Sequence, residues 1–460
     1  MVDTNIEILR FAQNDKVMKR RDFIKIAGAA TVAVACGPRG SQSGSGTTEE
    51  QMEMRENPVS GDKVSLLGFG CMRWPMTDGP EEEKVIDQDA VNEMVDYALE
   101  HGINYFDTSP VYLRGQSEKA AGVALSRHPR SSYFLATKLS NFSDASAEVG
   151  KKMSARSFEQ LKTDYFDYYL LHAMSGEEDF RKRYVENGLM DFLKEEKAAG
   201  RIRNLGFSFH GPKSGFDELI GLHDKGEYHW DFVQIQMNYV DWNHQDDKDE
   251  TQASYMYAEL EKRGIPVVIM EPLLGGQLAN VPSEISKQMK ARAPQKSVAS
   301  WAFRFCGSYP GVLCILSGMS SMDPLLDNIN TFGHFRVLSA DEKDFLERMA
   351  VQMKEYPLVG CTGCQYCMPC PWGIDIPGIF RHYNRAVTEG TYAQSSGQKD
   401  YARLKKAYLV SYDRAVASVR QADHCIGCGE CVKHCPQGIK IPGELRRIAR
   451  YVEGLKQDLL

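Results

Sequence analysis

The sequence lacks an excess of positive charge, because 55 lysines and arginines stand against 62 aspartates and glutamates, for a formal net charge of −7. This balance speaks against a dedicated nucleic-acid-binding protein. The sequence also lacks the long apolar runs of a polytopic membrane protein, and with 42% hydrophobic and 25% charged residues it is not generally disordered. A chain of 460 residues is expected to form one large barrel with appendages, or two to three domains.

Cysteine is scarce outside one region, since eight of the twelve cysteines lie between Cys361 and Cys435. That clustering predicts a metal site, because local spacing matters more than total number. Three others, Cys71, Cys306 and Cys314, occur in apolar strand or helix contexts. They are expected to be small core residues.

The N-terminal part is expected to be a targeting signal. Residues 19–36 are KRRDFIKIAGAATVAVAC, in which paired arginines precede an apolar run, Ile26–Ala35, that is too short to span a bilayer. It resembles a twin-arginine signal, whose cargo crosses the membrane already folded with its cofactors. We therefore expect a signal over 1–36, a flexible linker over 37–60, the twin-arginine export machinery as a partner, and a periplasmic or other extracytoplasmic location. A lipid anchor at Cys36 is an open alternative, and no transmembrane span is expected in the mature protein.

Eight short runs of aliphatic and aromatic residues recur from Val64 onward, and each precedes a stretch of helical periodicity. The runs are VSLLGFG (64), NYFDTS (104), SYFLATKL (132), FDYYLLH (166), IRNLGFSF (202), FVQIQMNY (232), PVVIMEP (266) and GVLCILSG (311). Eight strands alternating with helices predict an α/β fold, a (β/α)8 TIM barrel over 61–340, rather than an open doubly wound sheet. No G-x-G-x-x-G follows any run, which weakens a dinucleotide-binding Rossmann fold.

In such a barrel, catalytic residues lie at the C-terminal ends of strands, where the loops meet at one mouth. Asp107 ends the second predicted strand and Tyr112 follows it; Lys138 ends the third strand and His172 the fourth. A lysine ammonium beside a tyrosine hydroxyl is expected to lower the tyrosine pKa, and a carboxylate orients the lysine. An imidazole can hydrogen-bond a carbonyl oxygen. The four residues predict a proton-transfer site.

The sequence here resembles the aldo-keto reductase superfamily, over about residues 61–335. The motifs that carry the resemblance are FDTSPVY, ATK, LLH, GFSF, VQIQMNY, MEPLLGG and LSGMSSMDPLLDN. It implies that Tyr112 is the general acid, that Lys138 and Asp107 tune it, and that His172 orients a carbonyl for hydride from a nicotinamide.

The resemblance also implies cofactor contacts from six residues: Ser208, Gln236, Met270, Gly318, Ser320 and Asn328. The pattern departs from the family at two of these strand ends, because Phe209 stands where asparagine is usual and Met270 where a stacking tyrosine is common. The basic residues that often hold a 2′-phosphate are absent from SGMSSMDPLLDN, so NADPH and NADH both remain open.

The remaining residues, 341–460, are predicted to form a mainly helical ferredoxin-type domain with two 4Fe-4S clusters. Residues 361–371 read CTGCQYCMPCP and residues 425–436 read CIGCGECVKHCP, the second being the bacterial ferredoxin run C-x2-C-x2-C-x3-C-P. By resemblance to dicluster ferredoxins the fourth ligands cross between the halves. One cluster would then use Cys361, Cys364, Cys367 and Cys435, and the other Cys425, Cys428, Cys431 and Cys370. Four-thiolate zinc sites and disulfides are the alternatives.

Two functions fit this combination. The first is an exported oxidoreductase that interconverts a small carbonyl compound and its alcohol by nicotinamide hydride transfer, with clusters for electron relay or structure. The second is an iron-sulfur electron-transfer protein, with a redox protein partner, whose barrel is a docking or ligand-binding platform. A hydride carries two electrons whereas a cluster normally passes one, and the sequence shows no flavin-binding pattern that would split the pair.

Overall fold

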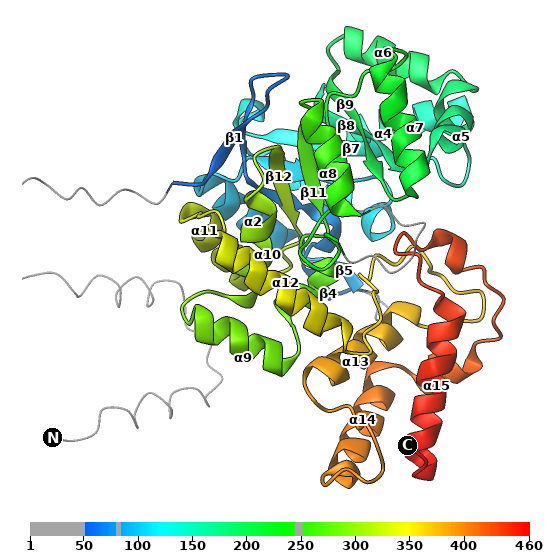
Figure 1. The fold of residues 1–460 in the computed structure, drawn as a ribbon. Helices are drawn as coiled ribbons and strands as arrows, with labels where there is room; N and C mark the ends of the chain where they lie inside the picture. The colour runs from blue at the N-terminus through cyan, green and yellow to red at the C-terminus, as the bar shows by residue number, and fades with distance from the viewer. Residues whose placement is uncertain (1–50, 80–83, 244–251) are drawn as a thin grey trace, which may run out of the picture. The chain divides into compact units, whose positions relative to one another are not determined.

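A computed structural model describes residues 51–79, 84–243 and 252–460, and residues Glu50–Leu460 form one compact unit (Figure 1). The predicted signal 1–36, Cys36 and most of the predicted linker 37–60 lie outside the described residues. The end of that linker is described, and Met54–Glu56 form strand β1, which pairs antiparallel with β2, Lys63–Ser65. Strand β1 therefore lies within the residues predicted to be linker.

Eight parallel strands close into a barrel in the order β10-β11-β12-β3-β6-β7-β8-β9, which confirms the predicted (β/α)8 fold. The strands are β3 (Leu67–Gly70), β6 (Tyr105–Asp107), β7 (Phe134–Leu139), β8 (Phe166–Met174), β9 (Ile202–Phe209), β10 (Val233–Gln236), β11 (Val267–Met270) and β12 (Val312–Ser317). Seven of them lie within the predicted runs, and β8 extends two residues past the end of its run at His172. The ring closes where Val233 of β10 pairs with Phe207 of β9.

Helices flank the barrel and alternate with its strands (Figure 1). They are α2 (Gln88–Glu100), α3 (Ser117–Leu125), α4 (Ala147–Leu161), α5 (Glu177–Phe180), α6 (Leu189–Ala198), α7 (Lys213–Asp224), α8 (Ala253–Lys262), α9 (Ser283–Arg292), α10 (Val298–Gly307) and α11 (Met322–Gly333). The Asp87 side chain caps α2, and Gly102 beyond its end has a φ of 84°. An L side chain there would be strained, which explains the glycine that closes this helical pattern.

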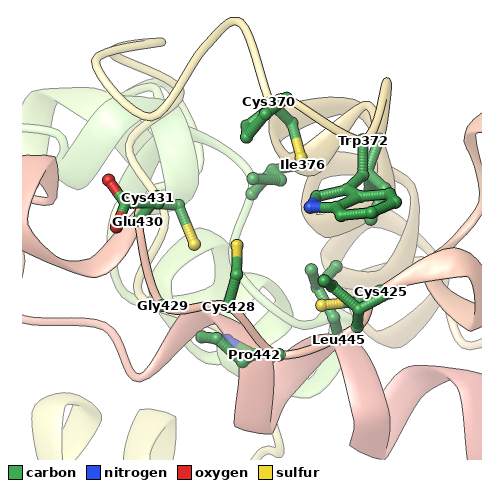
Figure 2. Close-up of a pocket in the computed structure, with 14 residues that line it drawn as sticks. Cys370, Trp372, Ile376, Cys425, Cys428, Gly429, Glu430, Cys431, Pro442 and Leu445 are labelled. Carbon is green, nitrogen blue, oxygen red and sulfur yellow. The ribbon is translucent and has the colours of Figure 1, made fainter.

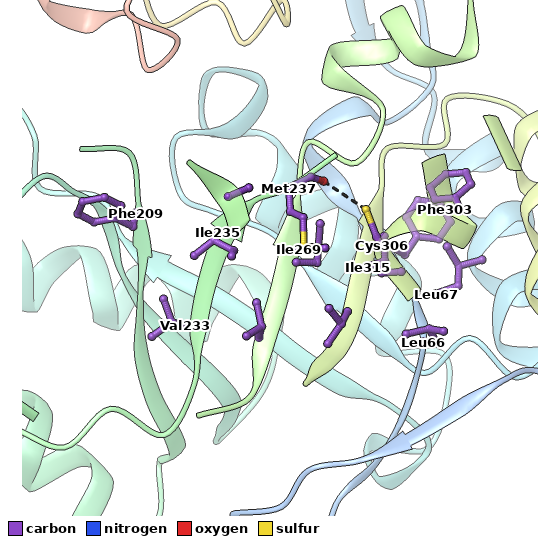
Figure 3. Packing of buried hydrophobic residues seen from close by; sticks show 14 of the residues in the cluster. Leu66, Leu67, Phe209, Val233, Ile235, Met237, Ile269, Phe303, Cys306 and Ile315 are labelled. Atoms are coloured by element: carbon purple, nitrogen blue, oxygen red, sulfur yellow. Dashed lines mark hydrogen bonds between the residues drawn. The ribbon is translucent and has the colours of Figure 1, made fainter. Parts of the chain in front are cut away.

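The barrel has a filled interior and an apolar outer layer beneath the helices, and Figure 3 shows part of the outer layer. Tyr105, Tyr168 and Phe232 pack inside, whereas Ile235, Ile269 and Ile315 belong to the outer layer. Each fully buried aliphatic or aromatic side chain of this kind stabilises the fold by about 1.5–3 kcal/mol. Cys71, Cys306 and Cys314 are buried free thiols, as expected for core residues.

Helix α12, Ala340–Lys354, belongs to the barrel's core, because Phe345, Leu346 and Met349 pack in that cluster. The boundary between the barrel and the C-terminal region thus lies after Lys354 rather than at the predicted residue 340. The helical pattern of 341–354 gave no sign of which core the helix would join.

The C-terminal region is helical, as predicted, with its own core. Its helices are α13 (Ile376–Thr388), α14 (Tyr401–Ala415) and α15 (Ile441–Gln457). Tyr383, Tyr408 and Leu455 are among the residues buried where these helices meet. Within 51–79, 84–243 and 252–460, no helix is long and apolar enough to cross a membrane.

Beside the barrel, β4 (Met76–Asp78) and β5 (Lys84–Ile86) pair as a separate two-stranded antiparallel sheet.

Candidate active site

The four residues predicted for proton transfer meet at the mouth of the barrel. Asp107 ends β6, Lys138 lies in β7, His172 lies in β8, and Tyr112 begins a short 3-10 helix, Tyr112–Gly115, that follows β6. Lys138 Nζ lies 2.5 Å from Asp107 Oδ1 and 5.0 Å from the centre of the Tyr112 ring. The Tyr112 and His172 rings are edge to face, with centroids 5.9 Å apart.

The buried pair of Asp107 and Lys138 anchors the site. Both side chains are almost inaccessible to solvent, and Lys138 also donates to the carbonyl oxygen of Thr108 at 2.9 Å. Gln234 donates to the second Asp107 oxygen at 3.2 Å. Burial raises the pKa of Asp107 and lowers the pKa of Lys138, since loss of water disfavours both charges, while their mutual attraction opposes each shift. The pair is fixed in one geometry by these bonds.

Tyr112 has a strongly raised pKa, so the expectation that Lys138 lowers it is wrong. Burial is the largest cause, followed by the neighbouring Tyr366 and Asp107. Lys138 does not offset this rise, because its ammonium donates to Asp107 and to the Thr108 carbonyl. Tyr112 therefore holds its proton across the ordinary pH range and can act as a proton donor.

His172 is held as a neutral imidazole. Its pKa lies well below the ordinary value because of burial, and the charges of Lys138 and Arg183 act in the same direction. The Ser140 hydroxyl lies 2.5 Å from His172 Nδ1. A serine proton donated to Nδ1 leaves the ring proton on Nε2, where it can hydrogen-bond a carbonyl oxygen. Arg183 donates to the His172 backbone carbonyl at 2.8 Å and holds the end of β8 in place.

Backbone strain is concentrated around this mouth. Leu113, Ala173 and Glu271 have φ values of 49°, 52° and 54°, and each directly follows one of the predicted site residues Tyr112, His172 or Met270. Positive φ is unfavourable for residues with a Cβ and recurs at functional sites. Glu271 is also a largely buried acid whose pKa is raised by burial, against the opposing charge of Arg73.

A tyrosine from the C-terminal region, Tyr366, lies over the catalytic residues. Its ring centroid is 6.3 Å from that of His172 and 6.3 Å from that of Phe142. Burial raises the pKa of Tyr366, and Asp107 adds to the shift. His172 is thus surrounded by aromatic rings from two parts of the chain.

The eight clustered cysteines gather around two cavities in the crossed arrangement that the resemblance to dicluster ferredoxins implies. The first cavity is lined by Cys361, Cys364, Cys367 and Cys435. The second is lined by Cys370, Cys425, Cys428 and Cys431, and Figure 2 shows these side chains around it. All eight are free thiols.

Each set of four thiols fits an iron-sulfur cubane. Such a cluster takes one thiolate at each of four separate irons. A tetrahedral zinc site instead draws four sulfurs to about 2.3 Å from a single ion. Among the described residues, no three histidine, cysteine, aspartate or glutamate side chains converge as a single ion would require. A bound cluster of this kind accepts and releases single electrons.

Comparison with known proteins matches both parts of the chain. Residues 66–350 match the model of the aldo/keto reductase family, and residues 360–440 match the 4Fe-4S dicluster domain. The chain belongs to the aldo/keto reductase family.

Relatives of this aldo/keto reductase resemble its barrel. An uncharacterized oxidoreductase of Bacillus subtilis is 26% identical over 322 residues, which is 64% of this chain and 95% of the relative. L-galactose dehydrogenase of Arabidopsis thaliana is 28% identical over 319 residues, which is 65% of this chain and 94% of the relative. Among solved structures, an aldo-keto reductase from Bacillus halodurans in its holo form has a TM-score of 0.52 and 25% identity, covering 65% of this chain and 96% of that chain.

The residues assigned to the nicotinamide by family resemblance already have partners within the chain. Gln236 donates to Asp241 at 2.6 Å and to Gln437 at 3.2 Å, and Gln437 donates back to Gln236 at 2.9 Å. The Ser208 hydroxyl accepts from the backbone N–H of Ala173 at 2.8 Å. The Gln236 amide nitrogen thus has two acceptors within the chain, and its oxygen already accepts one hydrogen bond.

The other assigned positions differ in their exposure. Met270 ends β11 and is partly buried, and Ser320 is exposed. Gly318 is also exposed, and a Cβ on it would lie 3.1 Å from the Arg73 side chain. Asn328 is buried and donates to Ser317 at 2.9 Å. As folded, Gln437 occupies the Gln236 amide at the end of β10, so a nicotinamide carboxamide would have to displace Gln437 to bind there.

Sequence reasoning missed several residues of this site. Gln234 had a signal, because it lies two residues before Gln236 on the same strand, where side chains share a face. Ser140 follows β7 directly, but serine there has many ordinary explanations. Tyr366 and Gln437 had no signal at all, because only tertiary contact brings the C-terminal region to the barrel mouth.

Proposed function

We propose that this aldo/keto reductase interconverts a small carbonyl compound and its alcohol at the barrel mouth. The observation that carries the proposal is that Tyr112, His172 and the Lys138–Asp107 pair lie together at the barrel mouth. In the reductive direction His172 Nε2 binds the carbonyl oxygen and Tyr112 donates a proton to it. Lys138 and Asp107 keep the Tyr112 ring and its surroundings in position.

Family resemblance names a nicotinamide, NADPH or NADH, as the hydride source. The hydrogen bonds between Gln236 and Gln437 oppose this source, because Gln437 would have to move before a nicotinamide carboxamide could bind Gln236. The cysteine sets support two 4Fe-4S clusters, one in each cavity.

A second candidate function is electron transfer with the barrel as a docking platform. The direct hydrogen bonds between Gln236 and Gln437 favour it, because they occupy a cofactor position. A redox protein partner belongs to both candidates. Exposed Cys428 and the neighbouring exposed Trp372 support contact with such a partner at the second cavity.

Export by the twin-arginine machinery to the periplasm or another extracytoplasmic site is also part of the proposal. Its support is the sequence KRRDFIK followed by a short apolar run. Mass spectrometry of the mature N-terminus tests cleavage and shows whether Cys36 carries lipid.

The decisive experiment on the barrel compares wild type with Tyr112→Phe, using anaerobically purified full-length protein. Methylglyoxal and nitrobenzaldehyde serve as carbonyl probes, and NADPH, NADH and reduced methyl viologen serve in turn as reductants. Loss of the phenolic proton should slow carbonyl reduction by at least about 100-fold with whichever reductant works. Tyr97→Phe, a tyrosine in α2 that stacks on His101, is the matched control and should retain the rate. Equal rates in Tyr112→Phe and wild type would leave electron transfer as the function.

A further inference from the structure

The first cysteine loop, Cys361–Cys367, packs against the barrel beside Arg73, which follows β3, and beside the segment Leu274–Ala279, which follows β11. A Cβ on Gly275 would meet the Thr362 Cα at 2.3 Å, so only a glycine permits this approach of the two backbones. Arg73 donates to the Thr362 carbonyl, and Gln277 donates to the Cys361 carbonyl at 3.3 Å. Thr362 is 3% exposed. The backbone of the loop therefore makes direct contacts with the barrel.

A residue close to Cys435, the fourth thiol of this set, makes a further contact with the barrel. Gln437, two positions after Cys435, exchanges hydrogen bonds with Gln236 at the end of β10. Cys435 and Gln437 line the same cavity as Cys361. The residues that fill the groove thus lie on the same loops that carry the first set of thiols.

Tyr366 links this loop to the catalytic pocket. It lies between Cys364 and Cys367 in the sequence, and its ring faces His172 edge on. It also contributes to the raised pKa of Tyr112. One aromatic residue thus separates the first set of thiols from the proton donor.

We propose that the Cys361–Cys367 loop and Gln437 are a built-in occupant of the nicotinamide groove, and that the site takes its electrons from a one-electron carrier instead of a nicotinamide. This inference rests on the proposed carbonyl chemistry. It concerns the source of electrons, and the groove contacts that support it are independent of the substrate.

The overall conversion balances without a hydride donor. Two reduced carrier proteins of iron-sulfur or flavin type are each oxidised by one electron, and the carbonyl carbon is reduced. The carbon–oxygen π bond breaks while one O–H and one C–H bond form. One proton comes from Tyr112, which is re-protonated from water, and the other comes from solvent. Because the electrons arrive singly, the expected substrates are carbonyls conjugated with a second carbonyl or an aromatic ring, which delocalise an unpaired electron.

The first test measures nicotinamide binding to full-length, cluster-loaded wild type under anaerobic conditions. Calorimetry and nicotinamide fluorescence are followed up to about 1 mM NADPH or NADH, the upper end of the usual range for such ligands. We expect no binding, and we expect amide exchange in 361–367 to stay slow whether or not nicotinamide is added. A dissociation constant below about 0.1 mM for either nucleotide would overturn the proposal.

The second test uses two neighbouring glycines. Gly275→Ala places a methyl group against Thr362, whereas a Cβ on Gly276 meets nothing within 4 Å, and both glycines have positive φ. Both substitutions therefore strain the backbone, but only Gly275→Ala adds a clash with Thr362. We expect amide exchange in 361–367 to rise at least 10-fold in Gly275→Ala and to stay unchanged in Gly276→Ala. Equal exchange in the two variants would show that the loop is not seated against Gly275, and the proposal would fail.

Reductant choice separates this inference from the proposed function. Reduced methyl viologen should support reduction of the dicarbonyl probe methylglyoxal at least 100-fold faster than NADPH or NADH. If nicotinamides fail to bind and no reductant drives carbonyl reduction, the carbonyl chemistry is wrong while occupancy of the groove stands. If NADPH drives the reaction in wild type, the occupancy is wrong and the carbonyl chemistry stands.

Discussion

The two halves of the iron-sulfur region are repeats of one another, yet they face different surroundings. The CTGCQYC run of the first half corresponds to CIGCGEC in the second, so Thr362 aligns with Ile426 and Tyr366 with Glu430. Thr362 is 3% exposed against the barrel, whereas Ile426 is 61% exposed. The same backbone motif thus carries residues that fit a protein surface in one half and remain accessible in the other.

The segments after the fourth cysteines extend this contrast. CPWGIDIP after Cys370 corresponds to CPQGIKIP after Cys435, which aligns Trp372 with Gln437. Gln437 is hydrogen-bonded to the barrel, while Trp372 is 54% exposed beside the second cavity. The first set of thiols is therefore built into the barrel site, and the second set lies where another protein can reach it.

The largest expected difference between the halves comes from removing one thiol from each. Cys364→Ala and Cys428→Ala should each lose about half of the iron, because each set holds its own cluster. Only Cys364→Ala should also release the loop from the barrel, with carbonyl reduction by reduced viologen falling more than about 100-fold. Iron analysis and single-substrate kinetics measure both effects. Equal loss of activity in the two variants would show that the halves are functionally equivalent.

The next largest effect concerns the aligned residues Tyr366 and Glu430. Tyr366→Ala removes the aromatic roof over His172 and should lower kcat/KM for a carbonyl probe by about 10-fold, which corresponds to about 1.4 kcal/mol. Glu430→Ala breaks only an exposed ion pair with Lys433, which is worth less than about 1 kcal/mol, and should leave the kinetics unchanged. If Tyr366→Ala had wild-type kinetics, the ring would serve packing alone.

Much of the barrel could be predicted from the sequence, because the strand signal is local. The runs around Phe106 and Leu170 are apolar and bounded by polar turns, and parallel strands bring their C-terminal ends together. Asp107 and His172 were placed at one mouth for that reason. The crossed cysteine sets came from resemblance to a known module, since spacing alone does not choose between pairings.

The docking of the two regions could not be predicted in this way. Arg73 and Thr362 are separated by 289 positions, and Gln236 and Gln437 by 201. No periodicity or motif encodes contacts of that range, because they depend on the shapes of two folded surfaces. The raised pKa of Tyr112 was missed for the same reason, since burial under Tyr366 is a tertiary effect.

The pH dependence of carbonyl reduction offers a finer test of the contact between Tyr366 and the site. Burial holds the pKa of Tyr112 well above its ordinary value, so the protonated donor persists and the rate should stay level from about pH 7 to about pH 9. Tyr366→Ala admits water and lowers the Tyr112 pKa toward about 10, which brings a decline at alkaline pH into view. Glu430→Ala should keep the level profile. A wild-type rate that already falls between about pH 7 and about pH 8 would contradict the raised pKa.

The smallest effect is expected from the second aligned pair, Gln437 and Trp372. Gln437→Ala removes the hydrogen bonds to Gln236 and leaves the latter's partly buried amide short of a partner, which should cost about 1–2 kcal/mol of stability. Trp372→Ala shortens a side chain that is more than half exposed and should cost about half as much or less. Chemical denaturation of the cluster-loaded protein measures both. The reverse order of costs would mean that the second half, rather than the first, holds the two regions together.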